Sequence, residues 1–106
     1  MKLRYTPEAW RDLQDMRDYI SGTLSNPQAA ERIVKSIHAA CQMLKEQPNM
    51  GRSVGIEPVH QVEMRFIVCE KHLAFYMMEG EIISVVRILN ARQDYLRIIL
   101  AAAEMR

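Results

Sequence analysis

The sequence predicts an α+β fold in which a helical hairpin packs on one face of an antiparallel sheet. Two segments in the first half have apolar residues spaced by three and four, as amphipathic helices do. The second half instead alternates apolar and polar residues, as half-buried strands do. With 106 residues, of which 49% are hydrophobic and 25% charged, the chain has the size and balance of one globular unit. We therefore expect residues 1–106 to form a single domain.

A short strand followed at once by a helix is expected at the start of the chain. Lys2–Tyr5 alternates polar and apolar residues and stops at Thr6 and Pro7. Thr6 is a favourable N-cap, and Pro7 suits the first helical position because its missing N–H would be unpaired there. The apolar stripe that should face the core consists of Ala9, Trp10, Leu13, Met16, Ile20 and Leu24.

The same start signal returns at Asn26 and Pro27, a few residues after Gly22, and predicts a second helix behind a tight turn. This helix should end near Gln47, because Pro48 disfavours helical geometry in the residue before it. Its stripe consists of Ala30, Ile33, Val34, Ile37, Cys41 and Leu44. Isolated helices of this length are only marginally stable in water, so both apolar stripes are expected to pack against another part of the chain.

Residues 48–60 lack a steady period and hold two glycines and two prolines, which indicates a connecting loop. Alternation begins at Gln61 and continues through two turn signals, so we expect three consecutive strands in an antiparallel meander. After the strand from Gln61, the turns and strands are expected at Glu70-Lys71, Leu73–Met78, Glu79-Gly80-Glu81 and Ile82–Leu89.

Both faces of the last predicted strand are mostly apolar. Simple alternation places Ile83, Val85, Arg87 and Leu89 on one side and the intervening residues through Asn90 on the other. One face can pack on the helical hairpin. The other should then remain exposed, and an exposed apolar patch of this kind usually marks a partner site.

The end of the chain is locally basic. The formal net charge is only +1, which does not predict strong nonspecific attraction to nucleic acid. From Ile82 onward, however, four arginines face two acids. We interpret the polar segment from Arg87 to Arg97 as a rigidly mounted recognition surface, because it follows directly on an apolar strand.

The two cysteines, Cys41 and Cys69, lie in periodic apolar segments without ligand-type spacing, which favours buried thiols over a metal site or a disulfide. No apolar run approaches the roughly 20 residues that span a bilayer, and the first ten residues lack the apolar core of a signal peptide. A cytoplasmic protein without a membrane partner is expected.

Five segments, in order, are similar to a known family: YTPEAWRDLQDMRDYI, NPQAAERIVKSI, LKEQPNMGR, LAFYM and VVRILNARQDY. Together they resemble the RelE/ParE superfamily of bacterial toxins, and most closely its ParE-like, plasmid-stabilisation branch. The resemblance implies a RelE/ParE-like fold with an N-terminal strand, a helical hairpin, a three-stranded meander and a short C-terminal segment. It also implies the toxin of a type II toxin–antitoxin pair, held inactive by a cognate ParD-like antitoxin.

Two activities occur in that superfamily: ParE-like members act on DNA gyrase, and RelE-like members cut messenger RNA on the ribosome. Cutting RNA requires groups that exchange protons near neutral pH. Arg65 and Arg87 cannot do so, position 90 is Asn where the ParE branch often has His, and residues 48–60 contain no Lys, which leaves His60 as the one nearby imidazole. We therefore expect a gyrase-binding toxin with no catalytic residue, metal or cofactor and no sequence-specific nucleic acid binding. The alternatives are a ribosome-dependent mRNA endoribonuclease and a weakly toxic binding module.

Two sets of surface residues follow from this expectation. The candidates for target binding are Arg65, Arg87, Asn90, Arg92, Tyr95 and Arg97. The candidates for antitoxin binding are Trp10, Leu13, Arg17, Tyr76 and Met78.

Structural roles compete with these functional ones. Arg87 could form an ion pair with Glu63 or another sheet carboxylate, and Arg92 and Asp94 could belong to a solvated turn against which Tyr95 packs its ring. Trp10 could lie in the core.

Overall fold

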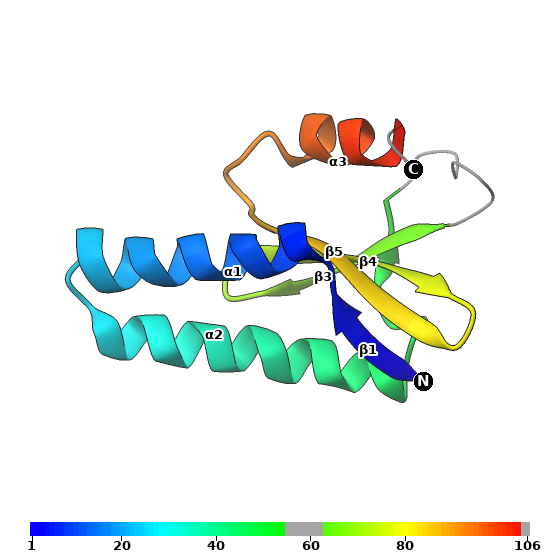
Figure 1. Ribbon diagram of the computed structural model, residues 1–106, viewed down its shortest axis with the longest axis horizontal. Coiled ribbons are helices and arrows are strands. Elements are labelled where there is room, and N and C mark those ends of the chain that lie inside the picture. Colours follow the sequence, from blue (N-terminus) through cyan, green and yellow to red (C-terminus); the bar gives the residue numbers. More distant parts are fainter. Residues whose placement is uncertain (55–62, 105–106) are drawn as a thin grey trace.

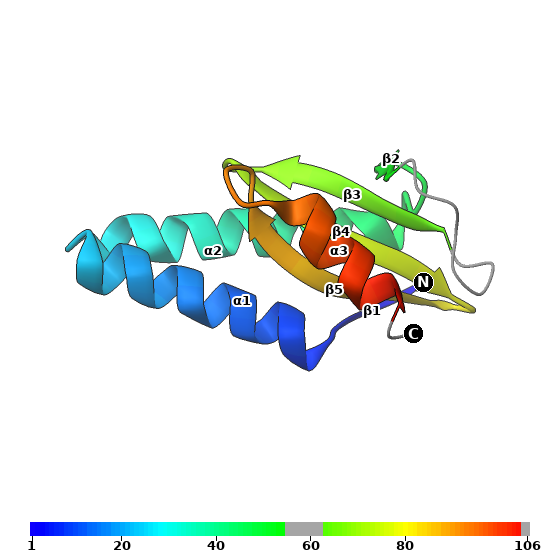
Figure 2. The ribbon, with the colours of Figure 1, turned by 90° about the horizontal axis from the view of Figure 1, so that it is seen from above.

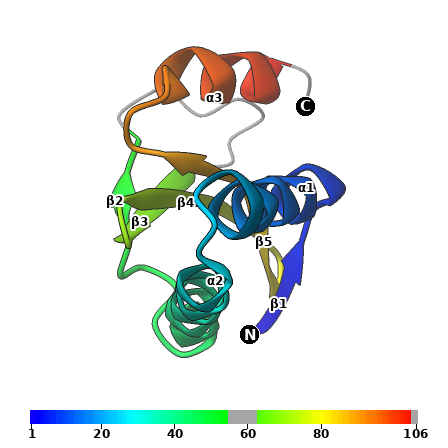
Figure 3. The ribbon, with the colours of Figure 1, turned by 90° about the vertical axis from the view of Figure 1, so that its left-hand side faces the viewer.

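The computed structural model describes residues 1–54 and 63–104 and arranges them in three layers, with one five-stranded sheet between a helical hairpin and a C-terminal helix (Figures 1 and 3). The predicted α+β class is confirmed. In chain order the elements are β1 (Lys2–Tyr5), α1 (Pro7–Asp18), a π-helical turn (Tyr19–Thr23), α2 (Pro27–Gln42), a 3-10 turn (Met43–Lys45), β2 (Arg52–Ser53), β3 (Met64–Cys69), β4 (His72–Glu79), β5 (Ile82–Asn90) and α3 (Tyr95–Glu104). His60, the start of the predicted strand at Gln61, and residues 55–60 of the predicted loop lie outside the described residues.

Both predicted N-caps are confirmed. The Thr6 hydroxyl accepts a hydrogen bond from the Ala9 N–H at 3.2 Å, and the Asn26 side-chain oxygen accepts one from the Ala29 N–H at 3.1 Å. The α-helical part of the second helix is shorter than predicted, since α2 gives way to the 3-10 turn after Gln42. The hairpin itself is as predicted (Figure 1).

The strands pair in the order β1-β5-β4-β3-β2. Strands β3, β4 and β5 form the predicted antiparallel meander, and β1 lies parallel to β5, so residues about 80 positions apart in the chain share a ladder. The predicted loop also contains a two-residue strand, β2, which pairs with Arg65 and Phe66 of β3. Within the described residues, β2 covers the outer edge of β3 at these two positions, and the Val54 N–H donates one further hydrogen bond to the Met64 carbonyl at 3.0 Å.

A bulge in β5 overturns the predicted assignment of its faces. Val85 pairs with Tyr76 but Arg87 pairs with Phe75, so Val86 is an extra residue between them. An extra residue inverts the alternation beyond it. As a result Ile88 joins Ile83 and Val85 in the core beneath the helical hairpin, whereas Leu89 joins Val86 on the opposite face.

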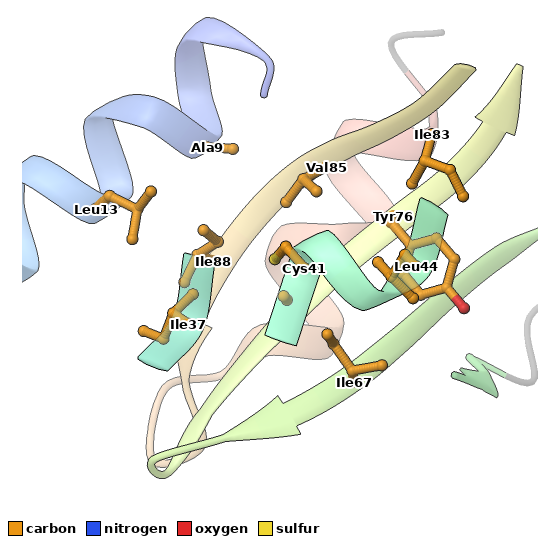
Figure 4. Close-up of a cluster of buried hydrophobic side chains, with 11 residues drawn as sticks. Ala9, Leu13, Ile37, Cys41, Leu44, Ile67, Tyr76, Ile83, Val85 and Ile88 are labelled. Atoms are coloured by element: carbon orange, nitrogen blue, oxygen red, sulfur yellow. The ribbon is translucent and has the colours of Figure 1, made fainter. Parts of the chain in front are cut away.

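The core between the hairpin and the sheet is apolar and closely filled. Figure 4 shows these side chains pointing toward one another from α1, α2 and the sheet. The buried members are Ala9, Leu13, Ile37, Cys41, Leu44, Ile67, Ala74, Tyr76, Ile83, Val85 and Ile88.

The prediction that the second face of the sheet stays uncovered is wrong, because α3 packs over it (Figures 2 and 3). Ile99 of α3 is buried in a second cluster with five sheet residues, and Tyr95 and Ile98 pack against it. The sheet members are Leu73, Phe75, Met77, Val86 and Leu89. The second face of the sheet is therefore a second core.

The predicted stripe of the first helix is wrong at two positions. Trp10 is 54% exposed, because it lies a quarter turn away from Ala9 at the margin of the stripe, and Leu24 lies beyond the helix in the exposed turn. The interpretation of Trp10 as a core residue is thus wrong. Within the described residues, no helix is long and apolar enough to cross a bilayer.

Cys41 is fully buried and Cys69 is partly buried, and both are free thiols. Burial raises the pKa of Cys41 to about 11, because its effect is larger than that of the hydrogen bond with Tyr5, which lowers the pKa. The unfolded thiol ionises near its ordinary pKa of 9.0. The folded protein keeps the proton longer, so this contribution to stability is complete below pH 9 and is lost as the pH rises toward 11.

We expect the free energy of unfolding to fall by about 1 kcal/mol between pH 8 and pH 10 because of Cys41. Urea denaturation at both pH values measures the change. The Cys41→Ala variant should lack this part of the fall, although it will be less stable at both pH values. An equal fall in the variant would contradict the assignment.

Candidate functional site

The predicted recognition segment begins at Arg87, whose guanidinium is held by α1. Its Nε donates to Asp12 Oδ2 at 2.8 Å and its Nη2 donates to Asp12 Oδ1 at 3.0 Å. Arg87 forms an ion pair as predicted, but the predicted partner is wrong: the carboxylate belongs to α1 and is neither Glu63 nor another residue of the sheet. The hydrogen bonds to Asp12 raise the pKa of Arg87 further, so the guanidinium stays charged at any relevant pH.

The position of Asp12 follows from where β1 ends. Beyond Tyr5, none of the described strands lies beside this edge of β5, and side chains of α1 and its N-cap take the place of a strand. The Thr6 hydroxyl donates to the Val86 carbonyl at 3.0 Å, and Asp12 Oδ2 accepts from the Ile88 N–H at 2.9 Å. Asp12 and Arg87 side chains are 14% and 26% exposed. The pair therefore closes the bulged edge of the sheet.

A compact turn follows, centred on Asn90. Its side-chain oxygen accepts from the Arg92 N–H and its own N–H donates to Gln93 Oε1, both at 2.8 Å. The Tyr95 ring then packs on Phe75 with centroids 5.9 Å apart. The interpretation of this segment as a turn with Tyr95 packed behind it is confirmed. Asn90 shapes the turn, and Tyr95 anchors α3.

Arg92 and Arg97 are the target candidates that present exposed side chains. Arg97 Nε lies 3.4 Å from Asp94 Oδ2, but the Arg97 side chain is 86% exposed, so this ion pair contributes little to the stability of the fold. Both guanidinium groups are accessible to a partner.

Arg65 lies elsewhere, beside the segment that leads into β2. Its Nη1 donates to the Gly51 carbonyl at 2.8 Å, and its Nη2 approaches Glu63 at 3.4 Å. The neighbouring Tyr76 hydroxyl accepts from the Gly51 N–H at 3.0 Å and donates to the Pro48 carbonyl at 2.8 Å. Arg65 and Tyr76 thus fix the chain after α2 to the sheet.

Two antitoxin candidates are corrected by this geometry. Leu13 and Tyr76 are buried in the core beneath the helices, because Leu13 lies at the centre of the α1 stripe and Tyr76 lies on the central strand β4. Neither can reach a partner in this fold. Trp10 and Arg17 are exposed and Met78 is half-buried, so these three stay predictions.

The six target candidates therefore occupy separate places: Arg65 beside β2, Arg87 against α1, and the others along the turn into α3. Asp12 and Gly51, which hold Arg87 and Arg65 respectively, were not predicted as their partners. For Gly51, the presence of a glycine shortly after a helix was a weak indication of a close contact. For Asp12, no neighbouring residue in the sequence indicated a role.

The sequence profile described as "ParE toxin of type II toxin-antitoxin system, parDE" matches residues 3–95. This chain belongs to the ParE toxin family. The predicted resemblance and its ParE-like branch are thereby confirmed. The match ends at Tyr95, so most of α3 lies beyond it.

A solved structure supports the same assignment for this ParE. The chain is similar to one described as "Chromosomal ParDE TA system from P. aeruginosa", with a TM-score of 0.70 and 26% sequence identity. The alignment covers 85% of this chain and 95% of that one. No curated protein matches this ParE. The predicted ParE-like fold is confirmed.

Proposed function

We propose that this ParE is a toxin that inhibits DNA gyrase by binding to it and that a cognate ParD-like antitoxin neutralises it. The observation that favours binding over RNA cleavage is that Arg65 and Arg87 have structural roles. These are the arginines with which a nuclease could clamp a phosphate, and each is instead hydrogen-bonded within the fold. Family membership supports the toxin role.

The outer edge of β3 is our proposed docking place for an extended antitoxin segment. Beyond Phe66 the strand continues without a β2 partner, and Val68 there is 66% exposed. A shallow groove beside it is lined by Met50, Gly51, Arg52, Phe66, Ile67 and Val68. An unpaired edge with apolar side chains favours an added strand, whose main chain completes the ladder.

Trp10 and Arg17 on α1 are proposed as the second antitoxin contact. The helix lies on the β5 side of the sheet and β3 on the other, so the antitoxin must wrap around the domain to reach both. Such a segment is expected to be disordered when free, with apolar residues for Trp10 and acidic ones for Arg17.

Purified toxin should inhibit supercoiling by gyrase and should leave ribosome-bound messenger RNA intact. Inhibition should disappear when the antitoxin is added in equimolar amount. Cleavage within translated codons would instead support the mRNA endoribonuclease. Undiminished growth on induced expression without antitoxin would contradict both toxic mechanisms and favour a weakly toxic binding module.

A further inference from the structure

We propose that the tip formed by the β3–β4 turn and the β5–α3 turn binds phosphate groups of duplex DNA through Lys71 and Arg92. The inference deepens the proposed function and rests on it, because gyrase bound to DNA is where the toxin would meet this ligand. The two turns lie side by side at one end of the sheet (Figure 2).

Hydrogen bonds join the two turns into one surface. The Ala91 N–H donates to the Lys71 carbonyl at 3.0 Å, and His72 pairs with Asn90 in the β4–β5 ladder. The Asn90 side chain in turn holds the Arg92 N–H at 2.8 Å. The backbones that carry Lys71 and Arg92 are therefore fixed relative to each other.

The charges at this tip are not balanced. Its two carboxylates already have cationic partners: Glu70 pairs with Arg32 at 2.9 Å and Asp94 pairs with Arg97 at 3.4 Å. Lys71 and Arg92 are both exposed, and neither forms an ion pair within the part of the chain that the structure describes. The tip thus carries two uncompensated positive charges in a protein whose formal net charge is +1.

The backbone beneath Lys71 is strained. Glu70 and Lys71 have φ angles of 52° and 66°, in the left-handed region that favours glycine. A two-residue hairpin turn of this kind usually contains Asn-Gly, and each residue with a Cβ costs about 1 kcal/mol there. Strain of this kind is concentrated at functional sites. Lys71 is one of the two residues of this turn between β3 and β4.

The chemistry of the tip favours phosphate over a protein partner. Apart from the methyl group of Ala91, the exposed side chains at its apex are polar or charged, namely Glu70, Lys71, Arg92 and Gln93. The large aromatic anchors, Trp and Tyr, that accompany Arg in protein hot spots are not among them. The His72 ring donates from Nδ1 to the Glu70 carbonyl, which leaves Nε2 directed away from that bond. A convex set of cations and hydrogen-bonding groups suits the phosphate backbone, which is contacted without reading sequence.

The test is an NMR titration of the isotope-labelled protein with a short DNA duplex at low salt. Amide shifts should concentrate at residues 70–72 and 90–93. The double variant Lys71→Gln/Arg92→Gln should bind at least about tenfold more weakly, and the slope of log affinity against log salt should shrink by about 2. The control Arg11→Gln/Lys35→Gln removes the same charge from exposed helix positions and should bind like the wild type.

Shifts centred elsewhere, or equal affinity in the tip variant, would overturn the proposal. Tighter binding of a single-stranded RNA of equal length would overturn the choice of duplex DNA. Circular dichroism of both variants checks that they are folded.

A supercoiling assay separates this inference from the proposed function. The tip variant should need about tenfold more protein than the control for the same inhibition. If wild-type protein fails to inhibit gyrase, the proposed function fails whatever the titration gives. If wild-type and tip variant inhibit equally and DNA leaves the tip unshifted, only the tip proposal fails.

Discussion

Replacing Gly51 by Ala should destabilise the protein by about 3 kcal/mol, from overpacking and from broken hydrogen bonds. A Cβ at this position would lie 2.5 Å from the Tyr76 hydroxyl and 2.8 Å from the Phe66 carbonyl oxygen. Both neighbours are fixed: Tyr76 is buried in the core, and the carbonyl belongs to β3. The segment must therefore move away and lose its hydrogen bonds to Tyr76 and Arg65.

Chemical denaturation followed by far-ultraviolet circular dichroism measures the effect. Gly22→Ala is the matched control, because nothing lies within 4 Å of a Cβ there and the residue belongs to a helical turn. That variant should be unchanged or more stable by up to about 1 kcal/mol. Equal stabilities for the two variants would show that the Gly51 segment yields without cost.

Replacing Asp12 by Ala should destabilise the protein by about 2–3 kcal/mol. The change leaves the Arg87 guanidinium, only 26% exposed, without its partner and leaves the Ile88 N–H without an acceptor. Asp12→Asn should cost less, because an amide oxygen can still accept from Ile88. Asp15→Ala, at an exposed position of the same helix, should change stability by no more than about 0.5 kcal/mol.

A double-mutant cycle with Arg87→Met isolates the interaction. Once the guanidinium is gone, Asp12→Ala should cost at least about 1 kcal/mol less than it does in the wild type. Strict additivity would mean that the carboxylate acts through the Ile88 N–H alone. Because Arg87 stabilises the fold, loss of toxicity after its removal would not identify a target contact. Substitution of the exposed Lys71 and Arg92 is therefore the better test of function.

Local signals in the sequence were sufficient for the helical hairpin and the meander. Thr6-Pro7 and Asn26-Pro27 mark helix starts through hydrogen bonds that span three residues, and Gly80 marks a turn. These features depend on neighbours in the chain, so a pattern can reveal them.

The remaining features depend on contacts between distant parts of the chain. The bulge at Val86 carries no compositional mark, and the Asp12–Arg87 pair joins residues 75 positions apart. Helix α3 was not predicted, because its apolar run is compatible with either a strand or a buried helix. The helix is favoured only because it covers the second face of the sheet, which the sequence pattern does not show. For the site, exposure of Arg92 and Arg97 fits the prediction, whereas Arg65 and Arg87 have structural partners that alternation alone could not reveal.

The pairing of β1 with β5 has a consequence for how the toxin folds. Lys2 pairs with Ile82, so a strand that is synthesised before the helical hairpin can join the sheet only after the meander has been made. Contacts of such long range form slowly, whereas the hairpin of α1 and α2 depends on contacts between neighbouring parts of the chain. The sheet of the toxin is therefore expected to close late in folding, after the helical hairpin has had time to form.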